Sequence, residues 1–209
     1  MKSKSTLLPW LIWAASAIFV LFQFFIQLSS GIIVDDLMHS FSINALGAGI
    51  LASTYYYVYV TLQTPAGMLI DRYGPRILLT GGGLVCALGC WIFASSQQLT
   101  WAEIGRVFMG AGSSFAFVGS MYLISQWFVP SKFAMMVGIA ETIGPAGTIV
   151  GNIFLATLLH SYGWRQCMFG AAMIALLIGF LCWLIIRDKP DHAQSEMLVT
   201  DTHFAEHVI

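Results

Sequence analysis

The sequence predicts an all-α membrane protein with six transmembrane helices. Hydrophobic residues make up 58% of the 209 residues and charged residues only 9%, whereas about 25% of residues are charged in soluble domains. Runs of about 20 apolar residues, the length that crosses a bilayer, recur between short polar turns. Nine Lys and Arg oppose ten Asp and Glu, so no overall charge favours nucleic acid as a partner. The expected surroundings are a lipid bilayer.

Hydropathy and turn signals place six expected spans. The first follows Lys2 and Lys4, as in a secretory signal, but its apolar stretch is longer than the about 7–15 residues of a signal core. We therefore expect a true span after an N-terminal segment of residues 1–7. The polar segment 188–209 is too short and too charged for another span and is expected to begin a central loop, either flexible or docked on the cytoplasmic face. The bundle covers 8–187, with spans at 8–31, 44–70, 77–95, 101–128, 133–159 and 166–187.

Positive charges set the expected orientation, because short loops rich in Lys and Arg stay in the cytoplasm. With the N-terminus inside, only Arg165 lies outside, and Arg106 lies within the fourth span. The two termini are therefore predicted to be cytoplasmic, and the expected location is the bacterial inner (plasma) membrane. The inside set is Lys2, Lys4, Arg72, Arg76, Lys132, Arg187 and Lys189.

No catalytic, metal or cofactor site is expected. A six-helix intramembrane serine protease needs a G-x-S-G motif and a His in a later span. Here Ser113 and Ser114 lie in "GAGSSF", and all five His lie in loops or the tail. The cysteines have neither the spacing of a metal knuckle nor that of a secreted disulfide framework, and packing as small hydrophobes is the expected role. They are Cys86, Cys90, Cys167 and Cys182.

Polar side chains follow one stripe in each of the first two spans. The first span carries Ser16, Gln23, Gln27 and Ser30 along one stripe. The second carries Tyr55, Tyr59 and Gln63 at steps of four. Such spacing fits a helix lining a wet cavity. Hydrogen bonding between helices, worth about 0.6–2 kcal/mol per contact, explains it equally well. Gln23, Gln27 and Tyr59 are candidate substrate or coupling residues.

Two ionisable residues lie inside expected spans, where a charge costs about 2.5–3.5 kcal/mol even on lenient scales. Arg106 lies about five residues into the fourth span, and Glu141 lies about eight residues into the fifth, near mid-membrane. Arg106 is a candidate to hold a substrate anion or to respond electrostatically when Glu141 takes up a proton. The alternative is a structural ion pair between them, which requires the long Arg side chain to reach.

The fifth span contains "GIAETIGPAGTIVGN", with a stripe of small residues that permits close helix approach. Pro145 removes a backbone donor and is expected to kink the helix. The segment is interpreted either as a hinge or seal between moving helices or as a static packing groove. Its residues are Gly144, Pro145, Gly147 and Gly151.

The turn after the second span carries the clearest family resemblance. The sequence "GMLIDRYGPR" is similar to the loop G-x-x-x-D-R/K-x-G-R-R/K between the second and third helices of the major facilitator superfamily, with Pro75 in place of the usual basic residue. Asp71 is expected to accept hydrogen bonds from helix N-termini and Arg groups on the inside face. The resemblance implies a charge-relay gate; the alternative is that the charges only set topology. The motif residues are Gly67, Asp71, Arg72, Gly74 and Arg76.

Weaker likenesses agree with this family over residues 8–190. Arg106 with Gly110 resembles its R-x-x-x-G feature. The segment 144–151 resembles the fifth-helix motif of proton-driven antiporters, with Thr148 in place of a glycine, which leaves antiport, symport and uniport open. "QWFVPSKFAMMVGI" and "IIRDKP" resemble the fourth-to-fifth connection and the exit of the sixth helix. "YGPR" is echoed by "YGWR", consistent with two inverted three-helix repeats.

The resemblance implies the N-terminal half of a secondary active transporter, because complete members have two six-helix halves with substrate between them. The expected function is movement of a small polar or anionic solute by alternating access, with proton coupling suggested by Glu141. One half cannot enclose a substrate, so we expect a partner: a separately encoded second half, a second copy of this chain, or the remainder of a longer protein. The alternative is a six-helix membrane protein that binds or regulates another protein without carrying solute.

Overall fold

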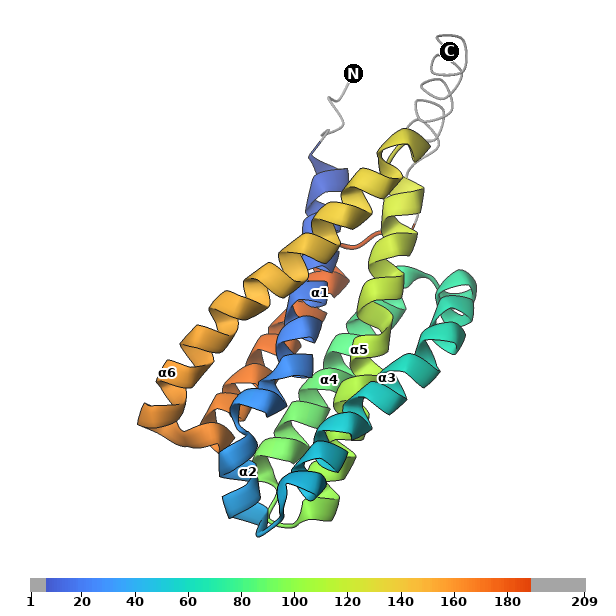
Figure 1. Cartoon of the computed structure of the whole chain (residues 1–209). Coiled ribbons are helices and arrows are strands. Elements are labelled where there is room, and N and C mark those ends of the chain that lie inside the picture. The colour runs from blue at the N-terminus through green and yellow to red at the C-terminus, as the bar shows by residue number, and fades with distance from the viewer. Residues whose placement is uncertain (1–6, 189–209) are drawn as a thin grey trace, which may run out of the picture.

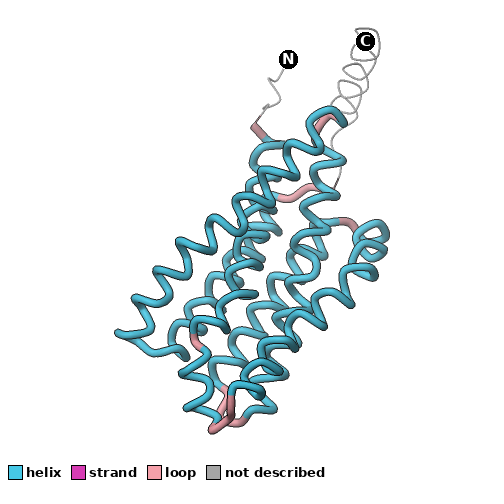
Figure 2. Tube along the Cα trace, viewed as in Figure 1, coloured by secondary structure: helices cyan, strands magenta, loops and turns pink. Residues whose placement is uncertain are grey.

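The chain forms a bundle of helices in the computed structural model, which describes residues 7–188 (Figure 1). The described part contains no strand, so the predicted all-α class is confirmed (Figure 2). The expectations for the first six residues and for 189–209 lie outside the described residues. The helices are α1 (Leu8–Ile32), α2 (Val34–Phe41), α3 (Ala45–Tyr73), α4 (Pro75–Ser95), α5 (Leu99–Trp127) and α6 (Pro130–Ile185).

Local sequence signals explain where several helices begin. Pro75 and Pro130 are the first residues of α4 and α6, where the missing N–H of proline would have no helical partner in any case. Asn44 precedes α3, and its side chain accepts a hydrogen bond of 2.9 Å from the backbone N–H of Gly47, which satisfies one free donor of the first turn. The short helix α2 was not expected from the sequence.

Helix α6 has 56 residues and bends at Gly163, whose φ of 75° is not helical. A straight helix of that length would measure about 84 Å, far more than the about 30 Å of a bilayer core. The bend produces two arms, a first arm (130–162) and a second arm (164–185), which coincide roughly with the expected fifth and sixth spans. The polar turn expected between them is reduced to one glycine joint.

Four of the described helices are long and apolar enough to cross a membrane: α1, α4, α5 and α6. Helix α3 has 29 residues but falls short in hydropathy, because Tyr55, Tyr57, Tyr59 and Gln63 interrupt its apolar sequence. The six-span arrangement therefore stays a prediction. It requires that α3 crosses the bilayer despite these polar groups and that each arm of α6 counts as a span.

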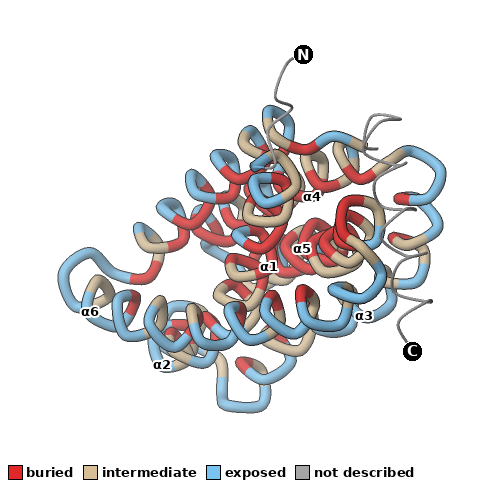
Figure 3. The backbone as a smooth tube through the Cα atoms, turned by 90° about the horizontal axis from the view of Figure 1, so that it is seen from above, coloured by how far each residue is buried: buried red, intermediate tan, exposed pale blue. Residues whose placement is uncertain are grey.

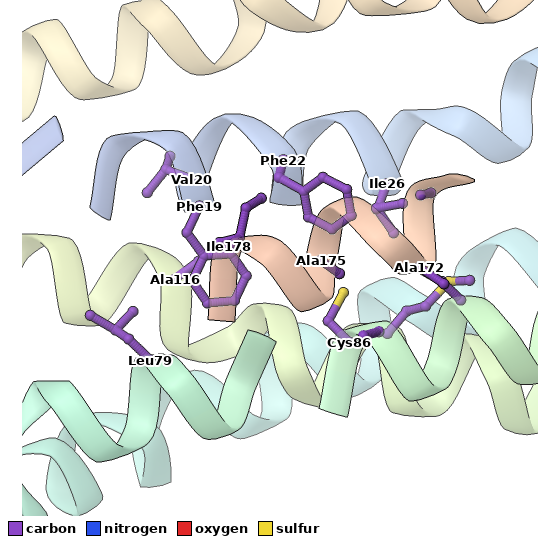
Figure 4. Packing of buried hydrophobic residues seen from close by; sticks show 14 of the residues in the cluster. Phe19, Val20, Phe22, Ile26, Leu79, Cys86, Ala116, Ala172, Ala175 and Ile178 are labelled. Atoms are coloured by element: carbon purple, nitrogen blue, oxygen red, sulfur yellow. The ribbon is translucent and has the colours of Figure 1, made fainter. Parts of the chain in front are cut away.

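Helix α5 lies in the middle of the bundle and packs against α1, α3 and α4, while α6 packs against α1 and α4. Seen along the bundle, buried residues gather around α1 and α5, and the outer faces of α3 and α6 are exposed (Figure 3). The apolar core joins α1, α4, α5 and the second arm of α6, for example through Phe19, Cys86, Ala116 and Ala175 (Figure 4).

Glycines bring some helix backbones into direct contact. A Cβ built on Gly82 of α4 would lie 2.7 Å from the backbone oxygen of Gly112 in α5, and one built on Gly83 would lie 2.8 Å from the Cα of Gly179 in the second arm of α6. Such close approach is typical of membrane helices that associate through small residues. Helix α4 is therefore held tightly to α5 on one side and to α6 on the other.

Candidate functional site

Arg106 joins three helices in the interior of the bundle. Its side chain is only 1% exposed. From α5 it donates to the backbone oxygen of Ile26 (3.3 Å) and the hydroxyl of Ser30 (2.8 Å) in α1, and to the backbone oxygen of Ala52 (3.3 Å) in α3. Arg106 lies seven residues after the start of α5, which is about 10 Å along the axis.

No carboxylate lies within ion-pair distance of Arg106 among residues 7–188. The charge is stabilised instead by carbonyl and hydroxyl oxygens and by the ring of Tyr55, whose centroid lies 5.0 Å from the guanidinium carbon. Its Nε is buried and has no hydrogen-bond partner in the described structure. A buried, unneutralised cation of this kind attracts anions, and it retains one free donor.

The candidate residues Gln23, Gln27 and Tyr59 lie close to this arginine, linked through Tyr55. The Gln23 amide donates to the Gln27 side-chain oxygen (2.8 Å), and the Tyr55 hydroxyl donates to the Gln23 backbone oxygen (3.4 Å). Tyr55 and Tyr59 stack with centroids 5.9 Å apart. Gln23 is buried, and its Oε1 has no hydrogen-bond partner among the residues that the structure describes, whereas Gln27 and Tyr59 are half-buried. The structure thus brings four of the five predicted substrate residues into one polar cluster.

Glu141 does not belong to this hydrogen-bonded cluster. It lies half-buried on the first arm of α6, and its Oε1 is buried without a hydrogen-bond partner in the described part of the chain. The alternative of an Arg106–Glu141 ion pair is not formed in the structure, because Arg106 is covered by α1 and α3. Glu141 therefore has a buried oxygen with no hydrogen bond to the cluster, and its predicted role in coupling stays a prediction.

The glycines of the first arm of α6 pack on α1. Cβ atoms built on Gly144, Gly147 and Gly151 would meet side-chain atoms of Phe24, Leu21 and Phe25 respectively. Pro145 lies on the exposed side, and the helix continues through it. The segment therefore forms a close helix contact, and its predicted use as a hinge or seal stays a prediction.

The turn with the family-like motif differs in detail from the expectation. Helix α3 extends to Tyr73, so Asp71 and Arg72 lie in its last turn and are exposed. Gly67 also lies within α3, 3.8 Å from Val118 when a Cβ is built on it. Only Gly74 leaves the helix, with a φ of 84° that side chains rarely adopt.

The carboxylate that caps a helix at this end is Asp188, not Asp71. Asp188 accepts a hydrogen bond of 3.0 Å from the backbone N–H of Arg76 in the first turn of α4, where negative charge is favourable. Arg76 in turn donates from Nε to the backbone oxygen of Trp183 (3.0 Å) and lies 4.2 Å from its ring centroid. A carboxylate therefore caps the start of α4, as expected for this turn, but the carboxylate belongs to Asp188 and not to Asp71.

Sequence reasoning missed three partners of the candidate residues. Tyr55 and Ser30 were recognised as members of polar stripes but not as contacts of Arg106. Asp188 was visible only as part of the exit sequence "IIRDKP". Each contact joins helices distant in sequence, so helical spacing could place the residue on a face without identifying its neighbour. The described residues contain no cluster of three or more His, Cys, Asp or Glu that could hold a metal ion.

Comparison with known proteins decides the family. The family model of the Major Facilitator Superfamily matches residues 12–205. The chain belongs to the major facilitator superfamily. It is consequently an integral membrane protein. Two solved structures of a bacterial homologue of the human lysosomal transporter Spinster share this fold at 15% sequence identity. The inward-facing unoccupied structure has a TM-score of 0.79 and covers 89% of this chain and 44% of its own chain. The inward-facing occupied structure has a TM-score of 0.80 and covers 90% and 46%.

Relatives in the superfamily are named as transporters, which agrees with the prediction that the chain is not an enzyme. The uncharacterized transporter YybO of Bacillus subtilis is 22% identical over 94% of this chain and 46% of its own length. The nitrate/nitrite transporter NrtP of Picosynechococcus is 28% identical over 63% and 30%. The chloroplastic ascorbate transporter of Arabidopsis thaliana is 23% identical over 83% and 33%. The chain spans less than half the length of these relatives.

Proposed function

We propose that this chain is the N-terminal six-helix half of a secondary active transporter that moves a small polar or anionic solute by alternating access. The observation that carries the proposal is Arg106, a fully buried cation that ties together three helices and has no carboxylate partner among residues 7–188. Family membership and the chain's share of its relatives' length support it.

Two inverted three-helix repeats form part of the proposal. The first would comprise α1, α3 and α4, and the second α5 with the two arms of α6. An inverted repeat predicts that the contact of α3 with α5 has a counterpart between the first arm of α6 and α1, and both contacts are made. The contact of α4 with the second arm of α6, through Gly83 and Gly179, then lies across the repeat axis.

The polar cluster suggests how this half would act. Arg106 would supply positive potential from a fixed position, and the half-buried Gln27 and Tyr59 are the proposed solute contacts. Glu141, whose buried Oε1 has no hydrogen-bond partner within residues 7–188, is the proposed proton-coupling residue. A second six-helix half or a second copy of the chain would close the cavity over these groups.

Solute uptake into proteoliposomes tests the proposal. The chain is reconstituted alone and with a second six-helix half from the same superfamily, and uptake of labelled nitrate, tartrate, ascorbate and sugars is measured. We expect uptake of an anion by the paired form. Replacement by Arg106→Met should lower it at least tenfold, because a hydrogen bond to a charged group contributes about 1.5–3 kcal/mol.

Lys132→Gln is the matched control, since it removes an exposed positive charge at the start of α6 without touching the cluster. The control should transport like the wild type. Uptake that is unchanged in Arg106→Met would remove Arg106 from the mechanism. A chain that folds but transports none of these solutes in either form would favour a binding or regulatory membrane protein instead.

A further inference from the structure

Two four-residue segments at opposite ends of the bundle share sequence and backbone geometry. Residues 73–76 read "YGPR" and residues 162–165 read "YGWR". Gly74 has φ 84° and ψ 153°, Gly163 has φ 75° and ψ 161°, and no other described glycine has a positive φ. Each glycine directly precedes a helix, α4 in the first case and the second arm of α6 in the second.

The two arginines that follow make reciprocal contacts. Arg76, in the first turn of α4, donates to the backbone oxygen of Trp183 near the end of the second arm of α6 (3.0 Å). Arg165, in the first turn of that second arm, donates to the backbone oxygen of Ser96, the residue after α4 (3.0 Å). Each arginine therefore binds a terminal carbonyl of the neighbouring helix, where a cation is favourable.

The contact at the Gly163 end involves further groups. The Arg165 guanidinium lies 4.4 Å from the ring centroid of Trp164. The Trp164 indole donates to the Ser40 hydroxyl in α2 (3.0 Å) and packs edge-on against Phe93 of α4 (5.4 Å between centroids). The start of the second arm is thus fixed to two other helices, α2 and α4.

The first arm of α6 is held in a different way. The second arm contacts α4 backbone to backbone, through Gly83 and Gly179. The first arm rests on α1 through side chains such as Leu21 and Phe24, which can change rotamer. A Cβ built on Gly163 meets no described atom within 4 Å, so the space beside this glycine is open.

We infer that Arg165 is a positioning residue that anchors the second arm of α6 to α4, so that the first arm turns about Gly163 during the transport cycle. Segment 162–165 is then the counterpart, at the other end of the bundle, of the family motif at 73–76. Arg165 holds the fixed side of the joint and Gly163 provides the movable point. The inference rests on the proposed function, because the movement serves alternating access.

Spin-label distances test this directly. Labels are placed on the full chain in lipid nanodiscs at Trp91→Cys in α4 and Ile153→Cys in the first arm, both exposed. The background carries Cys167→Ser, because the other three native cysteines are buried. Ten residues, or about 15 Å, separate Ile153 from Gly163, so a turn of about 15° moves the second label by about 4 Å.

We expect Arg165→Gln to lengthen or broaden this distance distribution, and Arg165→Lys, which keeps a charged donor, to restore it in part. Lys132→Gln, which removes an exposed positive charge at the start of the first arm of α6, is the matched control and should leave the distribution unchanged. A distribution in Arg165→Gln equal to the wild type would overturn the inference, as would equal broadening in both variants. The distances are recorded without solute, so they report on the joint separately from the uptake assay.

Discussion

The close contact of α4 with α5 leads to a quantitative prediction about Gly82. A methyl group at this position would lie 2.7 Å from the backbone oxygen of Gly112 and 3.2 Å from the Cβ of Phe115. Ordinary contact begins at 3.4 Å, so Gly82→Ala requires the backbones to separate by 0.7 Å, the difference between 3.4 and 2.7 Å. Neither obstacle is a flexible side-chain end that could move aside.

The neighbouring Gly81 is the matched control, because a Cβ built there meets nothing within 4 Å. Both positions are in the interior of α4, so both alanines gain about 0.5–1 kcal/mol of helix propensity. Overpacking costs about 1–3 kcal/mol and applies only to Gly82. We therefore expect Gly82→Ala to be less stable than Gly81→Ala by about 1–3 kcal/mol, which is about 2–12 °C in unfolding temperature for a chain of this length.

Thermal unfolding of the purified chain in detergent, followed by helical circular dichroism, measures the difference. Wild type, Gly81→Ala and Gly82→Ala are compared under one set of conditions. The expected order of unfolding temperature is Gly81→Ala at or above the wild type, and Gly82→Ala below it. Equal temperatures for the two variants would show that α4 and α5 are not in backbone contact at this depth.

Two further predictions concern the transport cycle. Asp71→Asn removes an exposed charge of the family motif, so we expect slower uptake with an unchanged unfolding temperature; an uptake rate equal to that of the wild type would reject a gating role. Glu141→Gln removes the titratable group from the first arm of α6, so uptake should lose its dependence on an imposed pH gradient; a variant that still responds to the gradient would exclude Glu141 from coupling.

Much of the helical layout could be predicted from local sequence. The apolar runs predict the helices, and glycine, proline and charge predict the turn near Gly74. The prediction failed where local signals were weak. Helix α2 is only eight residues long, too short for a periodic pattern to stand out, and the joint at Gly163 looked like a longer polar turn because Tyr162 and Arg165 flank it.

The site was predictable by residue type but not by contact. Spacing placed Gln23 and Gln27 on one face of a helix, and the expense of burying charge singled out Arg106. That spacing could not show that Ser16 hydrogen-bonds to Ser120 (3.1 Å) between helices, or that Ser30 binds Arg106. Residues of one polar stripe therefore have two roles: some hydrogen-bond between helices and others belong to the candidate site. Which role a residue has depends on the packing of helices that are distant in sequence.

The oxygen partners of Arg106 limit how this contact can change during evolution. Two of the three are main-chain atoms, of Ile26 and Ala52, and no codon change at those positions removes a carbonyl. In aligned sequences, contacting residues often change together. Among the oxygen partners of Arg106, only position 30 contributes a side chain, so correlated substitutions are expected only there. Suppressors of a defect at position 106 should accordingly be rare, and those that arise should reposition α1 or α3 as whole helices.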